Sequence, residues 1–240
     1  MSDRRRIAYP VLLVGFGLVA WSFWPGLLTP DSNQTIYQAG ADFSSDWWTA
    51  FGAIVLRWWL DLQLGLGTVY GLGIALNVIG LYLCCRAAFR RLPAAAATVA
   101  FTTFPPMAAQ LSGLSRDTFF LGFSLCAFGC FGAMLRPTTR QRRRQLVFAG
   151  LLLAFLGFLC RQNGIVVVLV LAGLAVAQGE LRWLAWLRPL RGRRTAIVTG
   201  AVAACLLAFI ASQLIYTVAG TKRVHPERVI YLYDLASIST

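Results

Sequence analysis

The chain has 240 residues, of which 58% are hydrophobic and only 13% are charged, and its mean hydropathy is +0.66. This composition excludes an ordinary soluble globular domain and favours a polytopic membrane protein. The formal net charge of +13 comes from short basic clusters between long apolar runs, a pattern that argues against nucleic-acid binding.

Seven apolar segments have or approach the length of about twenty residues that a bilayer-crossing helix needs. We therefore predict an all-α bundle with spans over 7–26, 67–88, 94–112, 118–135, 145–160, 164–179 and 196–218. The first span follows the basic start MSDRRR and offers no small-residue cleavage site, so we expect it to be retained. The whole chain, 1–240, is then a single transmembrane domain.

The segment 27–66, between the first two spans, is predicted to be an outer loop with juxtamembrane helices. Its first acid, Asp31, follows Pro30 and could cap a helix over SNQTIYQAG, or it could act as a general base just above the membrane. The aromatic-rich stretch 46–65 fits an interfacial helix and equally fits an aromatic belt at the start of the second span.

Three further polar positions lie at span ends. Arg116 and Asp117 begin the fourth predicted span, either as a solvated pair or cap, or with Arg116 holding a phosphate at the membrane surface. RQNG at 161–164 predicts a tight hairpin, because a continuous helix would place Arg161 in mid-membrane at a cost of about 2.5–3.5 kcal/mol. Arg161 either anchors this hairpin by snorkelling or adds a second basic group to a phosphate site.

The six cysteines lie within or at the ends of apolar runs, where cysteine behaves as a small hydrophobe. Cys126 and Cys130 would share one side of a helix, but no histidine or further cysteine joins them. The sequence predicts no zinc site and no disulfide framework.

Charge fixes the predicted orientation. With the N-terminus in the cytoplasm, most of the 22 Lys and Arg residues fall on the cytoplasmic side, as the positive-inside rule requires. The outer side then receives Asp31, Asp42, Asp46, Asp61, Asp117, Glu227 and Asp234. We expect a multi-pass protein of the cytoplasmic membrane whose carboxylate chemistry takes place outside.

Four stretches, in this order and all on the outer side, resemble polytopic glycosyltransferases of the C class (GT-C) that use polyprenyl-phosphate sugars. The resemblance is to the bacterial branch related to protein-mannosyltransferase-like enzymes. The stretches are PGLLTPDSNQTIYQAGADFSSDWW, FPPMAAQLSGLSRD, CRQNG and VIYLYDLASIS.

The resemblance implies that an acceptor hydroxyl attacks the anomeric carbon of a lipid-linked sugar and that polyprenyl phosphate leaves. It makes Asp31 the favoured catalytic residue, as the general base or as an acid that organises the site, with Asp46 second. It also makes Arg116 a candidate for the lipid phosphate, with Asp117, Arg161 and Asn163 as further substrate-binding candidates. Some members need a divalent metal; the cofactor and the acceptor stay open, and the donor and membrane lipids are the expected partners.

Two features depart from the family pattern. Relatives tend to have Asp-Trp-His-Pro where this chain has Asp46-Trp47-Trp48-Thr49. They also usually continue through several more spans, so 219–240 is expected to be the start of an outer C-terminal segment and the likeness covers about half of a usual enzyme. An active enzyme and an inactive half both stay open, as does a non-enzymatic alternative, a transporter-like fragment or an assembly subunit.

Overall fold

The computed structural model describes residues 3–28, 30–40, 50–177 and 193–218. Within these ranges every regular element is a helix, and Leu27 and Gly113 form an isolated parallel bridge. The elements are α1 (Asp3–Phe23), α2 (Pro30–Gly40), α3 (Ala50–Asp61), α4 (Leu66–Ala88), α5 (Arg91–Thr103), α6 (Pro105–Ser112), α7 (Arg116–Ala133), α8 (Arg140–Cys160), the 3₁₀ turn η1 (Gln162–Gly164), α9 (Ile165–Ala177) and α10 (Arg193–Val218). The predicted all-α architecture is confirmed for this part of the chain.

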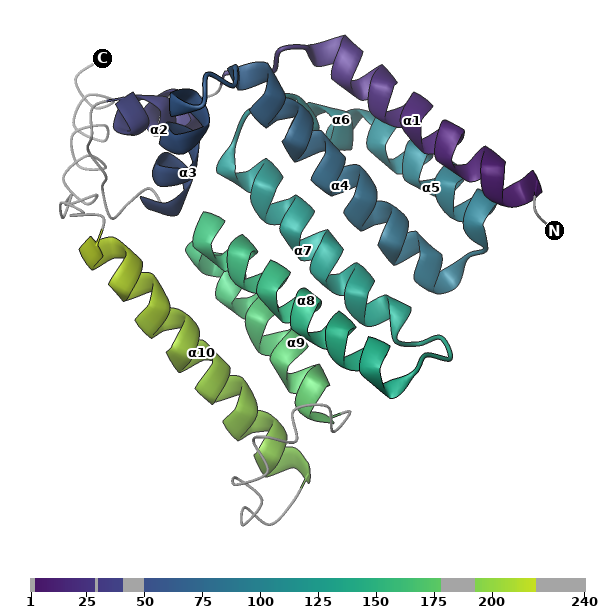
Figure 1. Ribbon diagram of the computed structural model, residues 1–240, viewed down its shortest axis with the longest axis vertical. Coiled ribbons are helices and arrows are strands. Elements are labelled where there is room, and N and C mark those ends of the chain that lie inside the picture. The colour runs from purple at the N-terminus through teal and green to yellow at the C-terminus, as the bar shows by residue number, and fades with distance from the viewer. Residues whose placement is uncertain (1–2, 29, 41–49, 178–192, 219–240) are drawn as a thin grey trace, which may run out of the picture.

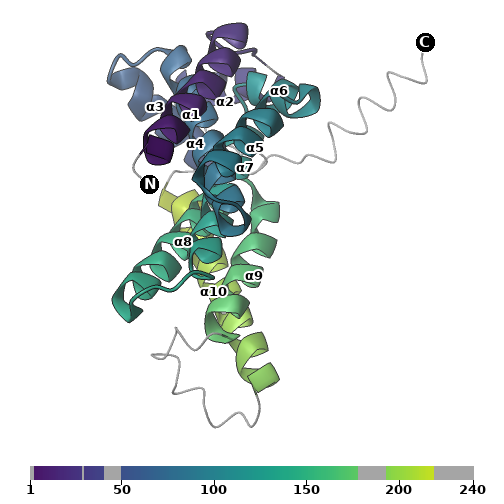
Figure 2. The same cartoon turned by 90° about the vertical axis from the view of Figure 1, so that its right-hand side faces the viewer.

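From α4 onward, the long helices other than α5 form a row in the order of the chain. α4 packs against α7 over most of its length, α7 against α8, α8 against α9, and α9 against α10, while α1 and α5 pack together beside α4. Figure 1 shows α1, α4, α7, α8 and α10 running across the molecule, and Figure 2 shows α2, α3 and α6 near one end of it. The short helices thus cover one end of the row.

Along the chain, the long helices α1, α4, α5, α7, α8, α9 and α10 reverse direction from one to the next, so the connections collect at two ends (Figure 1). The neighbours α4 and α7 therefore run parallel. At one end, Arg136 donates from Nη2 to the carbonyl of Phe89 at 3.1 Å, which joins the α7–α8 connection to the α4–α5 connection. We call residues 86–91 and 136–144 the arginine end. The opposite end contains α2 and α3, the starts of α4 and α7 and the end of α8, and we call it the α3 end (Figure 1).

The α4–α7 interface is built from small residues. A Cβ added to Gly80 would lie 2.7 Å from the backbone nitrogen of Cys126, and one added to Gly129 would lie 2.4 Å from Leu83 Cβ. Asn77 donates from Nδ2 to the carbonyl of Thr118 at 2.8 Å, and Cys126 donates from Sγ to the carbonyl of Leu76 at 3.3 Å. Glycine brings the backbones close enough for these polar contacts between helices.

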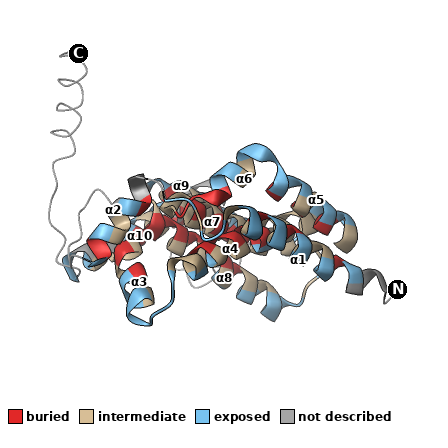
Figure 3. Cartoon of the chain, turned by 90° about the horizontal axis from the view of Figure 1, so that it is seen from above, coloured by how far each residue is buried: buried red, intermediate tan, exposed pale blue. Residues whose placement is uncertain are grey.

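Burial is concentrated along the middle of the row, as Figure 3 shows for α4, α7 and α9. The outward sides of α1 and α10 instead carry large apolar side chains, with Trp21 89% exposed and Leu207 61% exposed. Exposed apolar surface of this extent marks a protein or membrane contact.

Among the described residues, two helices, α4 and α8, are long and apolar enough to cross a membrane. They correspond to the predicted spans 67–88 and 145–160. Shorter apolar helical segments lie at Ile7–Phe23, Ile165–Val176 and Val202–Ile215. These two helices support membrane association by their length and composition, and the seven-span arrangement stays a prediction.

Two of the predicted boundaries can be compared with the structure. The hairpin at 161–164 is confirmed, since α8 ends at Cys160, η1 follows, and α9 begins at Ile165. The predicted span 94–112 is divided into α5 and α6 by an extended Phe104 at φ −61°, ψ 127°. A residue before proline is pushed out of the helical region, and Pro105 then suits the first position of α6. The segment 219–240 lies outside the described residues.

Candidate functional site

The α3 end is organised by the chain that follows α1. Leu27 donates to the carbonyl of Ser112 at 2.8 Å and accepts from the amide of Leu114 at 3.0 Å, so the residues before α2 lie beside those before α7. Gly26 permits this path, because its φ is +105° and a Cβ there would lie 2.9 Å from the Tyr70 ring. The start of α2 and the start of α7 are therefore held together.

α2 begins at Pro30, whereas a helix capped by Asp31 would begin two residues later, at Ser32. Asp31 consequently lies in the first turn of the helix, and the prediction that it caps this helix is wrong. The helix dipole stabilises a carboxylate in a first turn. The next residue, Ser32, is buried, and its Oγ donates to the carbonyl of Leu114. This bond connects the first turn of α2 directly to the segment that leads into α7.

The start of α7 is capped by Ser115, whose Oγ accepts from the amide of Thr118 at 3.3 Å. Arg116 and Asp117 follow as the first two residues of the helix, so Asp117 is a first-turn acid rather than the cap. Thr118 turns its hydroxyl back to the carbonyls of Gln110 and Gly113 at 3.1 and 2.9 Å. These bonds fix the direction in which α7 leaves the loop.

Asp117 forms an ion pair with Arg161, which terminates α8. The two side chains are 30% and 39% exposed, so water screens the pair and its contribution to stability is modest. Asp117 and Arg161 are both predicted site residues, and the structure brings them together across α7 and α8. Asn163, in η1, is exposed.

A cavity of about 150 Å³ opens between α2, α3, α4, α7 and the end of α8. Its lining residues are mainly apolar or aromatic, and the polar exceptions are Arg116 and the hydroxyl-bearing residues Ser32, Thr35 and Ser115. The lining residues are Ser32, Thr35, Ile36, Phe51, Gly52, Val55, Leu56, Trp59, Val69, Leu72, Leu114, Ser115, Arg116, Phe119, Phe123 and Cys160. An apolar space with a few convergent polar groups is the usual form of a ligand site.

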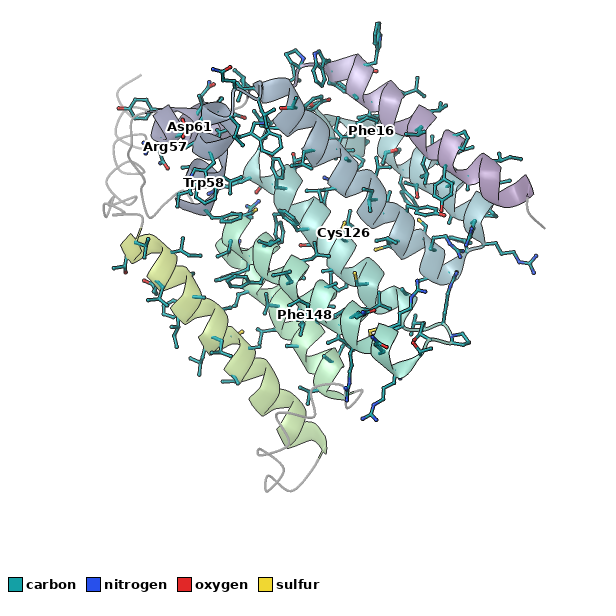
Figure 4. All side chains as sticks on the ribbon, viewed as in Figure 1. Phe16, Arg57, Trp58, Asp61, Cys126 and Phe148 are labelled. Atoms are coloured by element: carbon teal, nitrogen blue, oxygen red, sulfur yellow. The ribbon has the colours of Figure 1, made fainter. Side chains whose placement is uncertain are left out.

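The outer wall of this cavity is α3. Trp59 donates from Nε1 to Thr68 Oγ1 at 2.8 Å, and Thr68 donates in turn to the carbonyl of Gly65 at 2.6 Å, which ties α3 to the start of α4. Figure 4 shows Arg57, Trp58 and Asp61 on the same helix. The helix predicted within the aromatic-rich stretch 46–65 is present as α3, and its apolar side closes the cavity.

Of the predicted site residues, Arg116 lines the cavity, and Asp117 and Arg161 pair at the ends of the helices α7 and α8 that help form it. Asp31 lies in the chain next to Ser32, a lining residue, but its side chain is outside the described part of the structure, as is all of Asp46. Sequence reasoning missed Ser32, Ser115 and the α3 wall. Ser115 could have been found from its place before Arg116-Asp117, since serine is a preferred N-cap residue.

No group of three or more His, Cys, Asp or Glu side chains converges among the described residues. The Asp31 side chain and all of Asp46 lie outside the residues to which this applies. The six cysteines all lie within the described residues, are buried or half-buried, and form no disulfide.

The comparisons with known proteins give no relative to set beside this geometry. No protein-family model matches the chain, and neither a curated protein nor a solved structure matches it.

Proposed function

We propose that the chain is a multi-pass protein of the cytoplasmic membrane with its N-terminus in the cytoplasm, in which the seven apolar segments cross the bilayer. Two observations support this topology: the long helices reverse direction from one to the next along the chain, and α1 and α10 have exposed apolar surfaces. In this frame the arginine end faces the cytoplasm and the α3 end faces outward, in agreement with the positive-inside rule.

At the α3 end we propose a site for a polyprenyl-phosphate sugar, as in GT-C glycosyltransferases. The supporting observation is the apolar cavity with Arg116 in its wall. Such a space suits a ligand that is apolar at one end and anionic at the other: the prenyl chain contacts aromatic side chains such as Phe119, and a guanidinium binds the phosphate oxygens.

The proposed reaction needs a group that accepts a proton. The acceptor oxygen bonds to the anomeric carbon, the bond between that carbon and the phosphate oxygen breaks, and its electron pair leaves with polyprenyl phosphate. Asp31 is the proposed base that takes the hydroxyl proton, a role that typically contributes about 10²- to 10⁴-fold in rate. Asp46 is the second candidate for this role.

The activity test is sugar transfer by the purified full chain given polyprenyl-phosphate sugars, with release of polyprenyl phosphate as the readout. Asp31→Asn should lower the rate about 10²- to 10⁴-fold, while Asp61→Asn, which changes an exposed acid at the far end of α3, should leave it unchanged. If the chain is inert and cells carrying Asp31→Asn behave like wild type, the proposal fails.

The topology is tested separately by cysteine labelling from outside the cell. Asn33 and Gln141 are both exposed and lie in α2 and in the first turn of α8. A membrane-impermeant maleimide should label Asn33→Cys above the wild-type level and should not label Gln141→Cys until the membrane is opened. Labelling in the reverse pattern would contradict the orientation and the outer site together.

One observation favours the non-enzymatic alternative. The guanidinium of Arg161 is engaged by Asp117, as expected for groups that hold two helix ends together rather than bind a substrate. A structural subunit of this kind would keep its cellular function in Asp31→Asn and would show no donor binding at the cavity.

A further inference from the structure

The arginine end combines two connecting segments that contain basic residues and no acid. Residues 86–91 contribute Arg86, Arg90 and Arg91, and residues 136–144 contribute Arg136, Arg140, Arg142, Arg143 and Arg144. Every basic residue in both segments is arginine, whose planar fork matches phosphate oxygens. Sugar transfer at the α3 end does not use this surface.

The fold brings the two segments into one surface. Arg136 donates through Nη2 to the carbonyls of both Arg86 and Phe89, and a Cβ added to Gly132 would lie 2.9 Å from Ala87 Cβ. Arg91 and Arg136 each lie close enough to Arg86 for their positive charges to repel the charge of Arg86. Gathering like charges in this way is unfavourable unless an anion or the solvent compensates them.

Large apolar side chains flank these arginines and are also exposed. Phe89 is 50% exposed between Arg86 and Arg90, Leu135 is 76% exposed beside Arg136, and Phe148, on α8 (Figure 4), is 71% exposed one turn beyond Arg144. A surface that binds a water-soluble anion gains nothing from exposed phenylalanine and leucine. A surface at the boundary between headgroups and acyl chains needs both kinds of group.

We propose that the arginine end is a binding site for the headgroup of an anionic phospholipid. The arginines of the two connections bind the phosphate, and Phe89, Leu135 and Phe148 contact the first part of the acyl chains. The inference requires a membrane-embedded chain but does not depend on sugar transfer, so either idea can fail while the other stands.

The test uses the full chain purified in a neutral detergent and titrated with dioctanoyl phosphatidylglycerol, with bound lipid counted by native mass spectrometry. Dioctanoyl phosphatidylcholine is the uncharged comparison, and inorganic phosphate separates a headgroup site from a free-phosphate site. Phosphatidylglycerol should bind at least about tenfold more tightly than phosphatidylcholine, because each arginine near an anionic headgroup is worth about fivefold in affinity.

The decisive variant is the double substitution Arg140→Gln and Arg144→Gln, which removes two exposed charges. It should weaken phosphatidylglycerol binding about 25-fold, whereas Arg57→Gln, an exposed arginine on α3, should change it less than twofold. If the double variant loses helix content by circular dichroism, Arg90→Gln alone should still weaken binding about fivefold. Equal affinity for both lipids, unchanged affinity in these variants, or full displacement by inorganic phosphate at the lipid's concentration would overturn the proposal.

Discussion

The two sides of α7 are packed in opposite ways. Toward α4, Gly122 and Gly129 alternate with Cys126, and the helix backbones come so close that an added methyl group would overlap the neighbour. Toward α3, near the start of the same helix, Phe119 and Phe123 line an open cavity. Small residues thus produce a closed interface, and large residues hold neighbouring helices far enough apart to leave space between them.

The largest expected effect tests the closed side. Gly80→Leu places a side chain where even a Cβ would lie 2.7 Å from the backbone of α7, which cannot move aside as a flexible side chain could. We expect it to lower the free energy of unfolding by about 3 kcal/mol, measured by dodecyl sulfate titration in mixed micelles.

The matched control for this change is Gly17→Leu on α1, where no atom apart from the neighbouring residues and backbone of the same helix lies within 4 Å of an added Cβ. It should change the free energy of unfolding by less than about 1 kcal/mol. Equal effects of the two substitutions would show that the close approach of α4 and α7 does not limit stability.

A smaller effect is expected where the open side is joined to α8. Asp117→Asn removes the ion pair with Arg161, and since both side chains are about one-third exposed, the loss should be about 0.5 kcal/mol. A double-mutant cycle with Arg161→Gln isolates the pair energy. A coupling above about 2 kcal/mol would mean that the pair is far less hydrated than its exposure indicates.

The smallest stability effect is expected inside the cavity. Val55→Phe enlarges a side chain that lines open space, so the free energy of unfolding should change by less than about 0.5 kcal/mol. If the cavity holds the lipid donor, sugar transfer should nevertheless fall at least about tenfold, since losing about 1.4 kcal/mol of binding has that effect. If Val55→Phe lowers the free energy of unfolding and leaves sugar transfer unchanged, both the open space at this residue and its use by the donor are contradicted.

Turns and helix ends could be predicted from the sequence where residues close together in the chain determine them. Arg161 to Gly164 interrupt an apolar run, and the chain turns there between α8 and α9. The break at Phe104 was not predicted, because the apolar composition of 94–112 outweighed the local effect of Pro105 and Pro106 on the residue before them. The predicted position of Asp31 in the helix was wrong by two residues for a similar reason, since Pro30 can begin α2 itself.

The candidate site could be predicted only in part. Arg116 and Arg161 stand out in the sequence as charges at span ends, but nothing local indicates that Asp117 pairs with Arg161 or that Cys160 and Trp59 line the same cavity. Those contacts join residues of different helices, and they depend on how far apart the helices pack.

The sequence by itself determined where helices form and which of their ends are basic, because the length of an apolar run, proline and charge act on neighbouring residues. Only the tertiary structure decided that α4 and α7 touch along glycines while α3, α7 and α8 leave a cavity. Helix separation depends on the sizes of side chains that face one another from distant parts of the chain.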